Sequence, residues 1–545
     1  MKTQLSRNSF DVDQRYSGVY QQMGRMLTDA DWNELSDLTK YRLADALTDV
    51  IGSGTPRGRG ILEIMDHNDG TQSFNLRWGY AYVDGIIAQV RPDPTATLTD
   101  PNGVALEYEH QADFPHAPSR PASDHVLYLD VWERTVVILE DPNLLDPGLQ
   151  GADTCTRTQT MAQVKWCEPT ANPEDPAANP PIGEAELTLE LREASTEPDP
   201  CDPCADEIAL QDKVGNYLFR VEVHHVEYTD GLPSRVILKW SSENGAEQYI
   251  IDDAPLGFDT DEWVYEFYDG YFDADAATME TFDSEKHLGK HLTPGFTPTR
   301  GALFNGYPDT VPAGYTAVRR WDGYCELEKM GSTWTLVDGA DRGENLSTGS
   351  SSTAHSHVTE GPTVDINLDA LTLSIHIADL QLLAGDYWYA VVRQATNVAG
   401  DILLDAEKPS GIRHHYMTLG LVTDAGFTAY QGDQCKRFEF PPLTDIQAKD
   451  VCYDNTVCEM PNVNTVQNAI DYLCRERDLR WHNKHLHGWG VVCGLIAECG
   501  PDTLPDEDGD DTAEPERRQV GITPGYALTC EGEDVVLEKR FLITP

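Results

Sequence analysis

Residues 217–245 read YLFRVEVHHVEYTDGLPSRVILKWSSENG, and the pattern of this stretch points to the fold class. Apolar side chains occupy every second position from Tyr217 to Val223, and Arg235 to Trp240 has the composition of a second extended segment. A period of two is typical of a β-strand with one buried face. The Asn244–Gly245 pair that follows is a favoured hairpin turn. The stretch therefore predicts strands that pair in a sheet.

The same alternation recurs on both sides of this stretch. It is found at Phe74 to Tyr82, Leu127 to Val131, Leu187 to Leu191, Glu262 to Tyr268, Thr333 to Val337 and Asp386 to Arg393. Acidic, proline-rich stretches interrupt it at residues 168–184 and 197–206, and these are expected to be solvated loops or hinges. We therefore expect a mainly β, multidomain protein.

The N-terminal region follows a helical pattern instead. Apolar residues recur there at three- and four-residue steps, and Asp29 or Asp31 can cap the first turn. This predicts an amphipathic helix of about five turns, which the sequence GSGTPRGRG at residues 52–60 would end. The residues on its apolar stripe are Trp32, Leu35, Thr39, Leu43, Ala46, Leu47 and Val50.

Changes in composition suggest five parts of the chain. They are an N-terminal helical assembly segment (1–60), a β-rich core (61–342), an insertion rich in Ser, Gly and His (343–361), a β-rich continuation (362–442) and a small α+β C-terminal domain (443–545). The C-terminal domain is expected to hold a helix at residues 463–479 and two final strands. The last strand is expected at residues 534–543, so the chain stops in a strand-like segment, and a continuation of the natural chain beyond Pro545 is compatible with the pattern.

The charge balance excludes one class of partner. The 545 residues include 92 Asp and Glu against 40 Lys and Arg, a formal charge of −52. Such a surface repels the phosphates of nucleic acids, so binding to DNA or RNA is not expected. The polar N-terminus has no signal-peptide pattern, and no apolar run reaches the roughly 20 residues of a membrane span. We expect synthesis in the cytoplasm, with any release occurring as part of a larger particle.

Several ordered motifs resemble those of an uncharacterised family encoded beside phage-tail and extracellular contractile-injection genes. They begin with RYSGVYQQMGRMLTDADWNE at residues 15–34 and continue with VWER at 131–134, KWSSENG at 239–245, RRWDG at 319–323 and AGDYW at 384–388. A further motif, HNKHLHGWGVVCGL at residues 482–495, resembles a module of the same gene clusters. The resemblance implies a tail or baseplate part without assigned catalysis.

Two histidine groups are candidate metal ligands. His355 and His357 form an H-x-H pattern, and a threefold axis would gather six such imidazoles around one transition-metal ion. His482, His485 and His487 can place at least two imidazoles on one side of a turn. The alternatives are a flexible linker with incidental His for the first group and a structural turn for the second. The adjacent His414 and His415 point to opposite faces of a strand and are expected to be structural.

Cysteines offer a third candidate metal site. Cys201 and Cys204 form the only C-x-x-C pair, and Cys155 and Cys167 are the nearest further thiols. A structural zinc ion is the hypothesis, and free thiols in a proline-rich loop are the alternative. No cofactor is assigned beyond a transition-metal ion or zinc.

The leading hypothesis is a structural subunit of a phage-tail-like contractile injection system, in or near its baseplate. Its partners would be other tail subunits and copies of itself, and Tyr16, Tyr20, Trp32 and Leu35 are the expected interface residues. One alternative is a module that recognises target-cell glycans through Trp78, Tyr80, Trp388 and Trp489. A second is a cell-wall-degrading enzyme. No phosphate loop, nucleophile elbow or dinucleotide fingerprint is present, so no enzyme activity is expected.

Overall fold

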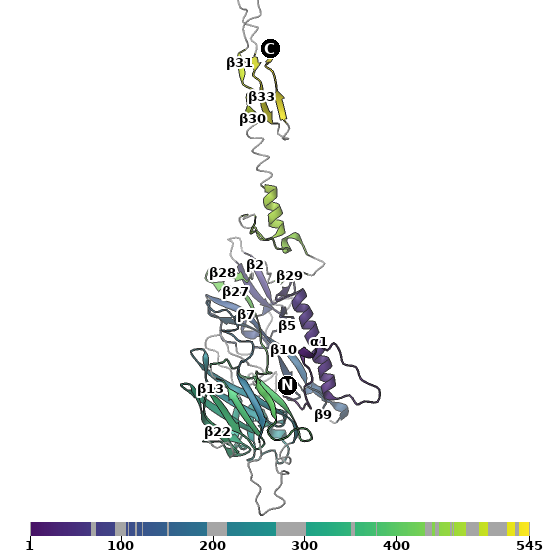
Figure 1. Cartoon of the computed structure of the whole chain (residues 1–545), viewed down its shortest axis with the longest axis vertical. Helices are drawn as coiled ribbons and strands as arrows, with labels where there is room; N and C mark the ends of the chain where they lie inside the picture. The colour runs from purple at the N-terminus through teal and green to yellow at the C-terminus, as the bar shows by residue number, and fades with distance from the viewer. Residues whose placement is uncertain are drawn as a thin grey trace, which may run out of the picture. The chain divides into compact units, whose positions relative to one another are not determined.

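The structure is a computed structural model, and the part it describes forms two compact units. Residues 1–432 and 437–440 make up the first unit, and residues 433–436 and 441–545 the second. The protein is mainly β, with its strands in several separate sheets, as the sequence predicts (Figure 1). The described residues are 2–66, 72–92, 105–106, 108–114, 117–121, 124–149, 152–192, 215–268, 301–349, 355–377, 379–430, 439–441, 446–457, 460, 463–475, 490–499, 520–528 and 534–543.

Two six-stranded sheets share the largest apolar core of the first unit. In the first sheet the strand order is β20-β19-β18-β13-β12-β25, and in the second it is β21-β22-β23-β24-β11-β26. Phe219, Val221 and Val223 of β12 enter this core from alternate positions, as the period of two predicts. The strands are β11 (Glu186–Leu191), β12 (Asn216–Thr229), β13 (Leu232–Ser241), β18 (Gly323–Met330), β19 (Thr333–Asp341), β20 (Glu344–Asn345), β21 (Ser347–Thr348), β22 (His357–Thr359), β23 (Thr363–Asn367), β24 (Leu371–His376), β25 (Tyr387–Arg393) and β26 (Ile402–Glu407).

A second core is built around a four-stranded sheet of order β10-β7-β27-β28. β7 is buried along most of its length, because further strands and loops cover the faces of this sheet. The four strands of this sheet are β7 (His125–Val136), β10 (Arg157–Cys167), β27 (His415–Thr423) and β28 (Gly426–Ala429). Two smaller sheets lie in the same part of the chain, and their strands are β2 (Leu62–Asp66), β3 (Gln72–Arg77), β4 (Gly79–Val83), β5 (Ile86–Val90) and β6 (Ala105–Leu106).

A third sheet, of order β14-β17-β15-β16, has its own small aromatic core. Its strands are β14 (Gln248–Ile250), β15 (Val264–Tyr268), β16 (Ala302–Asn305) and β17 (Ala317–Trp321). The remaining short elements of the unit are β1 (Thr55–Pro56), β29 (Glu439–Phe440), β8 (Leu145–Asp146), β9 (Ala152–Asp153) and the 3-10 helices η1 (Val12–Gln14), η2 (Tyr108–His110), η3 (Pro142–Leu144), η4 (Pro147–Leu149) and η5 (Ile251–Asp253).

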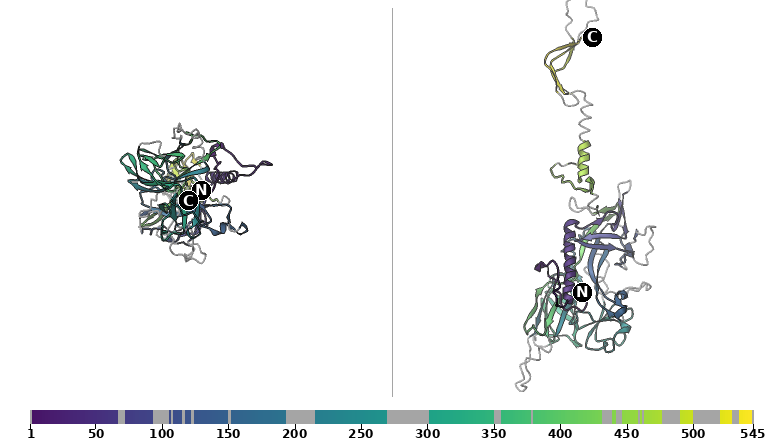
Figure 2. Two further views of the ribbon diagram at one scale, coloured as in Figure 1. Left: turned by 90° about the horizontal axis from the view of Figure 1, so that it is seen from below. Right: turned by 90° about the vertical axis from the view of Figure 1, so that its right-hand side faces the viewer.

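The predicted N-terminal helix is α1 (Asp29–Val50), which lies along the outside of the strands of the first unit (Figures 1 and 2). Thr28 and Asp31 close its N-terminus with a capping box, in which each side chain bonds the other residue's backbone NH. The chain continues from the helix through Ile51 and Gly52, whose amides bond the last carbonyls of α1.

Three local expectations differ from the structure. The segment from Phe74 to Tyr82 belongs to two strands, because the backbone bends at Trp78, between β3 and β4. Residues 168–184 are not a fully solvated loop, since Pro173, Asn179 and Pro180 are buried there. The described parts of the 343–361 segment contribute β20, β21 and β22 to the two large sheets, so main-chain pairing holds them in place.

The second unit contains a 3-10 helix, a helical stretch and two three-stranded sheets. The helical stretch covers residues 466–475, and the sheets have the orders β30-β33-β34 and β31-β32-β35. The elements are η7 (Ala448–Asp450), β30 (Gly490–Cys493), β31 (Ala497–Cys499), β32 (Val520–Ile522), β33 (Gly525–Leu528), β34 (Asp534–Leu537) and β35 (Phe541–Ile543). In the part of the chain that the structure describes, no helix combines the length and apolarity needed to cross a membrane.

Candidate functional site

The first residues of the chain are fastened to a charged face of β12 and β25. Lys2 Nζ lies 3.0 Å from Glu222 Oε1, and both side chains are buried. The Asn244 side chain donates a hydrogen bond of 2.6 Å to the Thr3 carbonyl, and Asn8 donates one of 2.7 Å to the Tyr389 hydroxyl. The start of the chain is therefore held at several points across the sheet.

A charged face exists here because side chains alternate along a strand. Phe219 and Val221 point into the apolar core, so Arg220 and Glu222 point to the opposite face. Glu222 lies 3.0 Å from Lys2, 2.8 Å from Arg220 and 3.3 Å from Lys239. The Glu222 carboxylate thus forms ion pairs with three buried cations.

Glu266 of β15 is the second buried carboxylate of this cluster. It accepts hydrogen bonds of 2.8 Å from both Lys239 and the Trp321 indole, and His224 lies 3.5 Å away. Burial raises its pKa, but the charges of Lys239, His224 and Arg319 outweigh burial and hold that pKa at about 2. A carboxylate that stays ionised in this way is a poor proton acceptor. The buried charges therefore fit a structural role, which links the sheet of β12 and β13 to the sheet of β15, better than they fit acid–base catalysis.

Helix α1 is attached to the body by a few contacts on one side. Ser6 bonds both carboxylate oxygens of Asp29 at 2.7 Å, and Lys40 Nζ lies 3.0 Å from Glu133 on β7. The helix backbone also lies directly on the β4–β5 turn, since a Cβ added at Gly85 would come within 1.9 Å of the Ala44 carbonyl oxygen. In α1 only Ala30 and Leu38 are buried.

The opposite side of α1 carries an exposed apolar row, which we call the α1 stripe. Its members are Trp32, Leu35, Thr39, Leu43, Ala46 and Val50, all of them exposed. At 3.6 residues per turn these positions fall on one side of the helix. The sequence-predicted stripe therefore faces away from the body of the first unit, except for Leu47, which is half-buried.

The preceding segment, residues 15–27, extends this apolar surface and is called the N-terminal loop. It projects away from the strands (Figure 1). Tyr20 is 90% exposed and Met26 88%, and Tyr16, Met23 and Leu27 are also exposed. The structure thus places all four expected interface residues, Tyr16, Tyr20, Trp32 and Leu35, on the surface.

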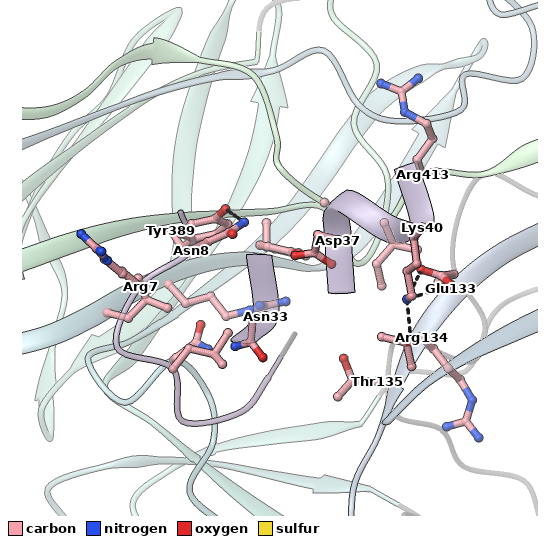
Figure 3. Close-up of a pocket in the computed structure, with 18 of the residues that line it drawn as sticks. Arg7, Asn8, Asn33, Asp37, Lys40, Glu133, Arg134, Thr135, Tyr389 and Arg413 are labelled. Atoms are coloured by element: carbon pink, nitrogen blue, oxygen red, sulfur yellow. Dashed lines mark hydrogen bonds and ion pairs between the residues drawn. The ribbon is translucent and has the colours of Figure 1, made fainter. Parts of the chain in front are cut away.

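A cavity of about 290 Å³ lies between α1, the start of the chain and the strands. Figure 3 shows Asp37 between the Asn8–Tyr389 pair and the Lys40–Glu133 pair. Burial raises the pKa of Asp37 above its ordinary value, in spite of the nearby Lys40 ammonium. The lining includes Arg220 and Tyr387, and the Tyr387 ring centre lies 3.7 Å from the guanidinium carbon of Arg220.

The candidate histidines lie in different environments. His355 is exposed and lies 3.0 Å from Glu344, whereas His357 is buried in β22 with Nδ1 3.3 Å from the Ser347 hydroxyl. One chain therefore does not present the two imidazoles side by side on its surface, and the trimeric metal site stays a prediction. His482, His485 and His487 lie outside the described residues, as do Cys201 and Cys204.

His414 and His415 have separate partners, as the strand geometry requires. His414 Nδ1 lies 2.7 Å from Asp130 and its ring stacks on Trp132, while His415 Nδ1 lies 2.9 Å from Asp84. Of the candidate zinc ligands, Cys155 is exposed and Cys167 is buried, both as free thiols. Within the described ranges, no three His, Cys, Asp or Glu side chains are grouped so as to hold a metal ion.

Sequence reasoning did not identify the buried charges or the cavity. A signal was present in LFRVEVH at residues 218–224, where charged residues fill the positions between apolar ones. Such positions normally face solvent, and here the start of the chain covers them. The cavity draws its lining from segments between Leu5 and His415, a span that no local pattern connects.

Comparison with known proteins gives one match. Residues 1–175, which include the N-terminal loop, α1 and the strands as far as β10, match the model of a family of unknown function (DUF6519). No curated protein and no solved structure matches the chain. The N-terminal third of the chain is thus similar to a family whose function is itself not assigned.

Proposed function

We propose that the chain is a structural subunit of a phage-tail-like contractile injection particle, in or near its baseplate. In this proposal the α1 stripe and the N-terminal loop form the surface on which another copy of the chain docks. The observation that carries it is a row of exposed apolar side chains on a helix whose other face is fastened to the body. The link to injection particles rests on the motif resemblance alone.

The composition of this surface suits a protein interface. Trp, Tyr and Met are enriched where proteins meet, and here Tyr20, Met23, Met26 and Trp32 are largely exposed within 13 consecutive residues. Contiguous exposed apolar surface of this kind marks interaction sites in soluble proteins. The fastening of Lys2 and Asp29 holds the surface in place before docking, which lowers the entropy cost of association.

The charge of the N-terminal loop favours a second copy of the chain as the partner that docks on this surface. The N-terminal loop contains Arg15 and Arg25 and no carboxylate, a charge of +2, so the rest of the chain carries −52 − 2 = −54. A basic apolar loop is complementary to the acidic surface that every other copy offers. A loop that docks on a different patch of the next copy makes a head-to-tail contact, which can close into a ring.

The glycan-recognition alternative gains no support from its aromatic residues. Trp388 is buried, and its indole donates a hydrogen bond to the Glu407 carbonyl, so its face is not open to a sugar. Trp78 is 45% exposed, but Arg59 covers the ring of Tyr80. Trp489 lies outside the described residues. No second function is therefore proposed.

The experiment measures association of the full chain and its entry into particles. Trp32→Asp with Leu35→Asp, and separately Arg15→Glu with Arg25→Glu, should abolish association in sedimentation velocity runs and exclude the chain from particles purified from the host. Leu256→Asp is the matched control, since Leu256 is fully exposed elsewhere on the first unit. Normal association and incorporation of both double variants would refute the proposal.

A further inference from the structure

One face of the four-stranded sheet carries an open apolar groove, which we call the β28 groove. Its volume is about 460 Å³, and residues 169–173 and the strands of the β27–β28 hairpin line it. Val126, Leu421 and Thr428 are register partners across β7, β27 and β28, so their side chains share this face. The second core lies on the other face, since Leu127 enters it from the next position along β7.

The groove exists because the loop over this face stops short of the edge of the sheet. Val126 of β7 is 9% exposed and packs in the same apolar cluster as Ala171 of the loop. Leu421 of β27 is 37% exposed, and Tyr430, directly after β28, is 45% exposed. β28 is the last strand in the order β10-β7-β27-β28. Burial therefore falls toward the edge strand, where apolar side chains are left open to solvent.

Hydrogen bonds hold the wall of the groove in place. The Thr418 amide donates a hydrogen bond of 2.6 Å to the Glu174 carboxylate, and the His414 amide donates one of 2.7 Å to the Pro181 carbonyl. Both bonds join the loop of residues 168–184 to β27 or to the residue before it. The loop is thus fastened beside the groove, and a preformed site of this kind loses little entropy on binding.

The charges around the groove indicate what kind of segment it accepts. Glu168 precedes the lining residues 169–173 and Asp424 lies in the turn between β27 and β28, and both are exposed. Among the described residues that line the groove there is no Lys or Arg. An apolar surface with an acidic rim is complementary to a segment that combines apolar and basic side chains.

We propose that the β28 groove receives the N-terminal loop of a second copy of the chain. This inference rests on the proposed function and adds the surface on which the loop docks. The loop offers Tyr20, Met23 and Met26, which are largely exposed, and its two charges, Arg15 and Arg25, are both positive. A groove of about 460 Å³ is within the size range of sites that enclose bulky apolar groups.

The positions of the two surfaces favour docking between copies. Figure 1 shows α1 and the N-terminal loop on one side of the strands of the first unit and β27 and β28 on the other. A contact between two different patches is head-to-tail, so each copy offers its groove to one neighbour and its loop to another. The contact therefore repeats from copy to copy and can close into a ring.

The test is reversal of charge on both sides of the contact, measured by sedimentation velocity of the full chain at low salt. Glu168→Lys with Asp424→Lys places a basic rim beside the basic loop and should weaken association by about tenfold or more. A chain that also carries Arg15→Glu and Arg25→Glu has an acidic loop and a basic rim. Its association should return to within about threefold of the wild type, because the charges are again complementary.

A matched control and an apolar variant complete this series. Asp252→Lys with Asp253→Lys makes the same change in net charge at exposed positions outside the groove lining and should leave association unchanged. Leu421→Asp places a carboxylate in the apolar contact and should weaken association by about tenfold or more.

A photo-crosslinking amino acid in place of Tyr20 identifies the receiving surface directly. In a mixture of ordinary and isotope-labelled chains, we expect cross-links from this position to residues 169–173 or 420–430 of another copy. Cross-links within one chain, or to the α1 stripe of another copy, would overturn the proposal. So would a chain with all four charge reversals that associates no better than the Glu168→Lys/Asp424→Lys variant.

Failure of this inference differs from failure of the proposed function. If the Trp32→Asp/Leu35→Asp variant does not associate while the Glu168→Lys/Asp424→Lys variant associates normally, the loop docks elsewhere, and only the β28 groove is ruled out. If the wild-type chain does not associate with itself, both the proposed docking surface and its receiving groove are wrong.

Discussion

Lys2 and Glu222 form an ion pair of 3.0 Å that ties the start of the chain to β12, a strand more than 200 residues further along the chain. Both side chains are buried, so solvent does not weaken their interaction. The pair fixes one end of the segment that leads to the N-terminal loop and α1. The exposed apolar surface is therefore positioned by a contact that lies well inside the protein.

Removing Glu222 is expected to release this segment. Glu222→Gln leaves Lys2, Arg220 and Lys239 buried with one carboxylate fewer, a change that typically costs about 3–5 kcal/mol. Urea unfolding should show this loss of stability, and amide exchange should rise across residues 2–9. Lys40→Ala breaks a half-exposed pair and should cost at most about 1 kcal/mol. Equal costs for the two variants would contradict the proposed role of burial.

The contact between α1 and the β4–β5 turn can be tested at one glycine. Gly85 has φ +79°, and an added Cβ would meet the Ala44 carbonyl oxygen at 1.9 Å. Gly85→Ala should therefore displace α1 and cost more than the roughly 1 kcal/mol of an unfavourable backbone conformation. Gly58→Ala is the control, because Gly58 has φ +77° with nothing within 4 Å. If the two variants have the same melting temperature, α1 does not pack as the structure indicates.

A pH dependence is expected from Asp386. Burial raises its pKa to about 7, although the Leu383 and Gly183 amides donate hydrogen bonds to the carboxylate. The folded protein then holds a proton that the unfolded chain loses near pH 4, so Asp386 favours folding at low pH. This contribution is lost as the pH rises from about 4 to 7.

Asp386→Asn should remove the Asp386 part of the slope, which reaches at most about 1.4 kcal/mol per pH unit for one proton. Burial also raises the pKa of Asp341 to about 7, so the double change with Asp341→Asn should flatten the profile further. The measurement is the free energy of urea unfolding at pH 4 to 8. An unchanged slope in both variants would show that these carboxyl groups are ionised in the folded protein.

The role of His357 can be separated from the trimeric metal hypothesis. Its buried ring packs against Gly349, where an added Cβ would lie 2.7 Å from the imidazole. His357→Ala should therefore destabilise the protein by about 1–3 kcal/mol without any metal, and His355→Ala, at an exposed position, should not. A melting temperature that falls on adding a chelator, in trimers with bound iron, zinc or nickel, would support the metal site instead.

The sequence alone determined the mainly β fold and the N-terminal helix. Period-two patterns such as Tyr217 to Val223 reflect which side chains meet the core, and the capping box of Thr28 and Asp31 is a local interaction. Both are encoded within a few consecutive residues. The net charge of −52 was likewise fixed by composition.

The tertiary structure decided which charged positions are buried. In the sequence, Arg220 and Glu222 look like the solvent-facing residues of a strand. In the folded protein both are buried, and Lys2 from the start of the chain lies 3.0 Å from Glu222. The neighbours of β12 are β13, which follows it directly, and β25, which lies far along the chain. Burial of a charge depends on such long-range pairing, because only the folded chain brings its counter-charge and its cover to the same place. The cavity, lined by residues from Leu5 to His415, is determined in the same way.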